Sequence, residues 1–124
     1  MKTAIIILSD PKSGSEEALG RVFNALAAAY DFKQKGNEVT VLFQGAGTRW
    51  LAELSKDDHP AHALFEEVRD TIAGASKACA DVFGASEEVA ASGFDLISEN
   101  PVPGTAGLPS VQALLTQGHT VLTF

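Results

Sequence analysis

The feature that most constrains the fold is a continuous apolar run near the N-terminus, from Ala4 to Leu8. A strand with one face in water alternates apolar and polar residues, but this run has no alternation. It therefore predicts a strand buried on both faces, which is typical of a parallel sheet covered by helices.

A long helical pattern and a second strand pattern follow. Apolar residues repeat at helical spacing from Leu19 to Tyr30, Gly36 is a typical helix end, and Val39 to Phe43 is another apolar β-branched run. Strand, helix and strand in this order predict a right-handed βαβ unit. We expect its helix to begin at a capping box formed by Ser13 and Glu16.

The rest of the chain continues the same alternation. Strands are expected over 75–79, 94–97 and 119–124, and a short helix is expected near Trp50. Further helices are expected from Pro60 to a stop at Gly74, from Ser86 to a stop at Gly93, and over 109–117. The pattern predicts a single domain over residues 1–124, a three-layer α/β/α sandwich with a mainly parallel five-stranded sheet.

The net charge and the cysteine content limit the classes of function that are expected. Lys and Arg total 9 against 16 Asp and Glu, which gives a net charge of −7 and argues against nucleic-acid binding. No run approaches the length of a membrane span, and the N-terminal run is shorter than a signal sequence, so we expect a cytoplasmic protein. One cysteine excludes an internal disulfide, and His59 and His62 lack a metal-ligand spacing, so no metal is expected.

The lone cysteine, Cys79, is the leading candidate for a reactive group. It ends the strand expected over 75–79, at the edge where open α/β sheets build their sites. A following helix N-terminus and Lys77 would favour its thiolate, whereas a close Asp81 would oppose it. The alternative is that Cys79 is a small buried hydrophobe.

Two other strand exits carry residues that suit a ligand. The loop from Ser9 to Ser15 suits a phosphate cradle, and it equally suits a capped helix start. Gly45 and Gly47 permit close approach of a ligand to the backbone, or they simply form a turn. We expect these two glycines to border a pocket with Asp10 at its rim.

The chain resembles the DsrE/DsrF-like family, small α/β proteins of sulfur-relay and sulfur-oxidation systems. The resemblance rests on the motifs Ile5–Pro11 with Ser15–Ala18, Asn37–Gly45, Ala78–Ala80 and Thr120–Phe124. It implies that Cys79 accepts persulfide sulfur from a donor protein and passes it to an acceptor protein, as a possible sulfurtransferase. It also implies no cofactor, and a homo-oligomer built on trimers or dimers.

Two other functions stay open at this point. One is a non-catalytic oligomeric module that binds a small anion or nucleotide at the strand exits. The other is a structural subunit in which Cys79 is unreactive. The pocket residues expected beside Cys79 are Asp10, Gly45, Gly47 and Lys77.

Overall fold

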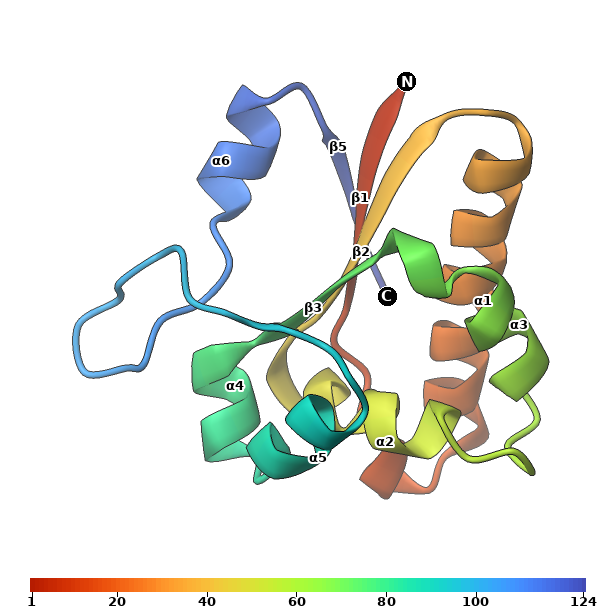
Figure 1. The fold of residues 1–124 in the computed structure, drawn as a ribbon, viewed down its shortest axis with the longest axis horizontal. Helices are drawn as coiled ribbons and strands as arrows, with labels where there is room; N and C mark the ends of the chain where they lie inside the picture. Colours follow the sequence, from red (N-terminus) through yellow and green to blue (C-terminus); the bar gives the residue numbers. More distant parts are fainter.

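A five-stranded sheet forms the centre of the molecule in the computed structural model, which describes residues 1–124 (Figure 1). The strand order is β4-β3-β2-β1-β5, and every neighbouring pair is parallel. The mainly parallel sheet predicted from the sequence is thus confirmed and is parallel throughout. The strands are β1 (Lys2–Ile7), β2 (Glu38–Phe43), β3 (Ile72–Ser76), β4 (Leu96–Ile97) and β5 (Thr120–Thr123).

Helices lie on both faces of the sheet and at one of its ends. Figure 1 shows two helices, α1 (Glu16–Gln34) and α3 (His62–Glu67), on one face and α6 (Val111–Thr116) on the other. The helices α2 (Trp50–Leu54), α4 (Lys77–Val82) and α5 (Ser86–Ala91) gather at the end where the strands finish. This arrangement confirms the α/β fold. No helix is both long enough and apolar enough to span a membrane.

The main core lies between α1 and the face of the sheet that this helix covers. The residues of β1 from Thr3 to Ile7 are all buried, as the apolar run predicted, but Leu8 at the end of that run lies beyond the strand and is exposed. The opposite face is covered less, because α6 has no buried residue. The largest fully buried side chains of the core are those of Ile5, Ile7, Leu26, Phe43, Leu51, Leu54 and Phe65.

The third strand lies earlier in the chain than the sequence predicted. It is β3, from Ile72 to Ser76, and Cys79 belongs to the first turn of α4. Gly74 was expected to end a helix, but it lies inside the strand with a φ of +145°. A Cβ at Gly74 would lie 2.3 Å from the Asp95 carbonyl oxygen, so glycine here permits close approach of a neighbouring chain segment.

Two predicted helix starts were also wrong. Ser15 caps α1 by accepting a hydrogen bond from the Ala18 N–H at 3.0 Å, so Ser13 and Glu16 form no capping box. Ser13 instead ends a separate 3₁₀ turn, Pro11–Ser13, which Asp10 caps. Pro60 lies in a turn before α3 rather than at its first position.

Candidate functional site

Three loops or helices that follow neighbouring strands meet at the carboxyl edge of the sheet. β1 leads into the loop that holds Asp10, β2 leads into the 3₁₀ helix η2 (Gly45–Arg49), and β3 leads into α4 with Cys79. Because β1, β2 and β3 are adjacent parallel strands, their exits lie next to one another. The structure thereby brings the three predicted regions to one edge.

Cys79 occupies a capped turn at this edge. Its thiol is free and half-buried. Its backbone N–H donates to the hydroxyl of Ser76 at 3.3 Å, and Ser76 is fully buried. The neighbouring N–H of Ala78 donates to the Gly107 carbonyl at 2.8 Å, which ties the β4–α6 segment to the start of α4. The backbone under the thiol is therefore held from two sides.

The two charged residues beside Cys79 are paired with each other. Lys77 Nζ lies 3.5 Å from Asp81 Oδ2, and Asp81 also accepts a hydrogen bond from the Ser86 hydroxyl. The Ser86 hydrogen bond, followed by the Lys77 charge, holds the pKa of Asp81 below its ordinary value. Residues two apart on a helix do not face each other, so neither charge faces Cys79.

An arginine that sequence reasoning missed joins the three exits. Nη1 of Arg49 lies 3.2 Å from each carboxylate oxygen of Asp10, and its Nε donates to the Phe83 carbonyl at 3.1 Å. Its guanidinium also lies 5.4 Å from the centre of the Phe83 ring. Phe83 is the C-cap of α4, so Arg49 fixes the helix of Cys79 to the exits of β1 and β2. The only signal in the sequence was a lone cation after a glycine-rich exit.

The two glycines of the second exit pack against the end of β1. A Cβ at Gly47 would lie 2.3 Å from the Ile7 carbonyl oxygen, so only glycine fits without a backbone shift. Gly45 adopts a φ of +57° and its Cβ would lie 3.5 Å from Leu8. The close approach that Gly47 permits is to the protein's own backbone.

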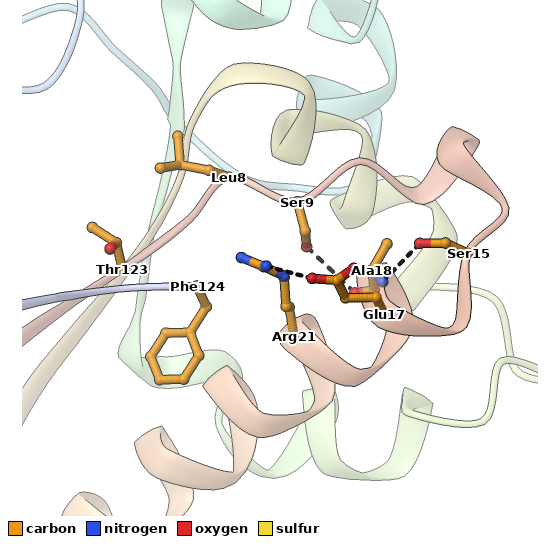
Figure 2. A pocket seen from close by; sticks show the side chains of 8 residues that line it. All are labelled: Leu8, Ser9, Ser15, Glu17, Ala18, Arg21, Thr123 and Phe124. Atoms are coloured by element: carbon orange, nitrogen blue, oxygen red, sulfur yellow. Dashed lines mark hydrogen bonds and ion pairs between the residues drawn. The ribbon is translucent and has the colours of Figure 1, made fainter.

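A pocket opens at the same edge, on the other side of β1 from the second exit (Figure 2). It has a volume of about 370 Å³ and lies between the ends of β1 and β5 and the first turns of α1. Two serines of the loop predicted as a phosphate cradle, Ser9 and Ser15, contribute to it. Its lining residues are Leu8, Ser9, Ser15, Glu17, Ala18, Arg21, Thr123 and Phe124.

His59 in the α2–α3 loop and His62 at the start of α3 hold this loop in place. His59 Nδ1 accepts a hydrogen bond from the Ala61 N–H at 3.0 Å, and His62 Nδ1 lies 2.8 Å from the Leu54 carbonyl oxygen. The ring of His59 also meets Trp50 edge-on. No group of three or more His, Cys, Asp or Glu side chains is placed to hold a metal ion.

Comparison with known proteins assigns the family. The sequence profile of the DsrE/DsrF-like family matches residues 1–124, the entire chain. The chain belongs to the DsrE/DsrF-like family. An uncharacterized protein of Methanocaldococcus jannaschii, MJ0733, is 30% identical over 89 residues, which are 72% of each chain.

A solved structure supports the fold of this DsrE/DsrF-like chain. A conserved protein of unknown function from Bacteroides thetaiotaomicron, BT1422, superposes with a TM-score of 0.65 over 99% of this chain and 94% of that chain. The two sequences are 19% identical, so this likeness shows the fold alone. The resemblance read from the sequence motifs is confirmed for family and architecture.

Proposed function

We propose that this chain carries sulfane sulfur on Cys79 between a donor persulfide and a partner thiol. The observation that carries the proposal is the position of Cys79 within a chain of this family. The only thiol of the protein is free and half-buried in the first turn after β3, at the edge where open α/β sheets place their sites. A fully buried thiol would favour a packing role instead.

The chemistry is two exchange steps of the thiol–disulfide type. The Cys79 thiolate attacks the outer sulfur of a donor persulfide, the donor S–S bond breaks, and the donor leaves as a thiolate. Cys79 then bears the persulfide. A partner thiolate attacks the same outer sulfur, takes it, and releases the Cys79 thiolate. The transferred sulfur keeps its oxidation state, so neither an oxidant nor a reductant is needed.

The arrangement of charges around Cys79 supports this role. Asp81 would oppose a thiolate if its carboxylate faced the sulfur, but that carboxylate is bound by Ser86 and Lys77. The backbone below the thiol is fixed by Ser76 and Gly107. A fixed backbone and paired neighbouring charges favour a thiol that reacts without rearrangement of the site.

Intact-mass spectrometry tests the proposal. The purified chain is incubated with a cysteine desulfurase and cysteine, and we expect the mass to increase by one sulfur atom. Cys79→Ala is expected to show no increase, and Asp81→Asn, which keeps the thiol, is expected to gain the sulfur. An unmodified wild-type chain, or an adduct that persists in Cys79→Ala, contradicts the proposal.

We also propose that the protein acts in the cytoplasm as a homo-oligomer, either a trimer or an assembly of dimers. The support is a set of exposed apolar side chains on α1 and α6. Size-exclusion chromatography with light scattering is expected to give a mass of two or more chains, and a monomer at micromolar concentration contradicts this. The exposed side chains are Leu19, Phe23, Tyr30, Val111 and Leu115.

A further inference from the structure

We infer that the pocket between β1, β5 and α1 binds a small uncharged heterocycle of the nucleoside type. The first reason is the order of the strands. From β1 to β4 each new strand is added on the same side of the sheet, and β5 then pairs with the other side of β1. α1 and α6 therefore lie on opposite faces, as Figure 1 shows. A crevice at such a reversal, beyond the carboxyl ends of the strands, is where open α/β sheets bind ligands.

The walls of this pocket are fixed by hydrogen bonds. The Leu8 N–H donates to the Phe124 carbonyl at 2.8 Å, and the Phe124 N–H donates to the Ile6 carbonyl at 2.9 Å. The Trp50 indole N–H donates to the Ser9 carbonyl at 2.7 Å. The volume of about 370 Å³ lies in the range of small-molecule sites. The backbone walls of the pocket at Leu8, Ser9 and Phe124 are therefore held by the protein's own hydrogen bonds.

One side of the pocket is apolar. Leu8 directly follows β1, and its side chain is 47% exposed although Thr3 to Ile7 are all buried. Figure 2 shows Leu8, Thr123 and the ring of Phe124 on the same side of the pocket. This side offers an apolar surface against which a flat ring system packs.

The other side presents a donor and an acceptor next to each other. Arg21 and Glu17 are one helical turn apart on α1, and the Arg21 guanidinium donates to the Glu17 carboxylate. That hydrogen bond keeps the pKa of Glu17 below its ordinary value, so Glu17 stays ionised at neutral pH and the pair has no net charge. Guanidinium donors beside a carboxylate acceptor match the edge of a nucleobase, where donors and acceptors also alternate.

Charge disfavours the phosphate that the serine-rich loop suggested. Glu16 and Glu17 occupy the first turn of α1 and already complement the positive end of this helix. The Ser15 hydroxyl already accepts the Ala18 N–H. A phosphate would lie beside these carboxylates without an unpaired cation, so an uncharged ligand fits better.

An NMR titration of the full-length chain with adenosine tests the inference. We expect saturable shifts of the amides of Leu8, Ser9, Ala18 and Thr123. Arg21→Gln is expected to weaken binding about tenfold, because it removes hydrogen bonds from a charged donor. Lys35→Gln is the matched control, because Lys35 forms the same kind of pair with Asp31 at the far end of α1, and it is expected to leave binding unchanged.

Three results overturn the inference. They are the absence of saturable shifts, shifts centred outside the pocket, and equal shifts from inorganic phosphate, which would make the pocket an anion site. A Lys35→Gln variant as weak as Arg21→Gln contradicts the assigned contact. Cys79→Ala is expected to bind adenosine normally, so this inference and the sulfur-relay proposal fail independently.

Discussion

Nη1 of Arg49 donates to both carboxylate oxygens of Asp10, each at 3.2 Å, and so connects the loop after β1 to the loop after β2. The same guanidinium donates to the Phe83 carbonyl at the end of α4. The Arg49 side chain is 23% exposed and that of Asp10 is 32% exposed, so the pair is only partly screened by water. One side chain thus holds the helix of Cys79 in place.

Replacing Arg49 tests this bridge. Arg49→Met is expected to lower the free energy of unfolding by about 2 kcal/mol, because it removes the cation paired with Asp10 and the donor to the Phe83 carbonyl. Asp10 then keeps only the hydrogen bond from the Lys12 N–H. Arg49→Lys is expected to recover less than half of the loss, because lysine lacks the planar fork. Urea denaturation measures both variants.

The control for Arg49 is an exposed pair elsewhere. Lys56→Met removes the surface contact with Glu53 and is expected to change stability by less than about 0.5 kcal/mol. A variant with lysine at position 49 that is as stable as the wild type would show that the simultaneous contact of the guanidinium with Asp10 and with the Phe83 carbonyl contributes nothing.

Two glycine-to-alanine changes are expected to have opposite effects. Gly47→Ala places a Cβ 2.3 Å from the Ile7 carbonyl oxygen and is expected to destabilise the fold by about 1–3 kcal/mol. Gly20 lies inside α1 with no atom within 4 Å of its Cβ position, so Gly20→Ala is expected to stabilise by about 0.5–1 kcal/mol. Thermal denaturation should show a fall and a rise in Tm, and a neutral Gly47→Ala would contradict the close approach of η2 to β1.

The serine caps of α4 and α1 form a second matched pair. Ser76 is fully buried, whereas Ser15 is exposed, and each accepts an N–H from three residues on. Ser76→Ala is expected to cost about 1–2 kcal/mol and more than Ser15→Ala, since water can replace only the exposed cap. Amide exchange of Cys79 is expected to accelerate in Ser76→Ala. Equal costs for the two variants would rule out this account of the α4 cap.

His59 is expected to make stability depend on pH below neutrality. Burial lowers the pKa of His59 below its ordinary value of 6.5, so the unfolded chain binds the proton more readily than the folded chain. Stability is therefore lost as pH falls through about 6.5 toward the lower folded pKa, and is regained on return to neutral pH.

His59→Asn is the variant that isolates this titration. Asparagine can still accept the Ala61 N–H but does not titrate, so the loss of stability between pH 7 and about 5 is expected to be smaller. Urea midpoints measured across this range check the result. An unchanged pH dependence in His59→Asn would assign the effect to other groups.

The sequence predicted the sheet well because its strongest signals are local. The run from Ala4 to Leu8 has no polar residue, and Ala4 to Ile7 are buried in β1, as this pattern predicts for a strand covered on both faces. Val39 to Phe43 and the long helix before it are likewise specified by their own residues. The number of strands and their parallel pairing follow from this alternation.

The errors occurred where local patterns compete. Glycine is typical of a helix end, so Gly74 was expected to end a helix. Only the close approach of the Asp95 carbonyl explains why a glycine is needed inside β3. Ser13 and Ser15 are both suitable N-caps for α1. Ser13 is taken up by the 3₁₀ turn that Asp10 caps, so Ser15 caps the helix. These choices depend on tertiary contacts that no short window contains.

The site was predicted only in part for the same reason. Asp10, Gly45 and Gly47 were expected to border one pocket; the parallel strands bring their loops to one edge, and their role in a pocket stays a prediction. Arg49 was missed because its partners, Asp10 and Phe83, are 39 and 34 residues away in the chain. Lys77 was expected beside the thiol, but its ammonium lies against Asp81 one turn on.

The most direct test of the sulfur-relay account is to load and then discharge Cys79 while following its mass. A cysteine desulfurase and cysteine labelled at sulfur are used to load the chain with sulfur. Peptide mass spectrometry then locates the label, and the loaded chain is treated with a small thiol. We expect one labelled sulfur on the peptide that contains Cys79, followed by its complete transfer to the thiol. A Cys79 peptide that never gains the label, or that gains it and cannot release it, would contradict the account.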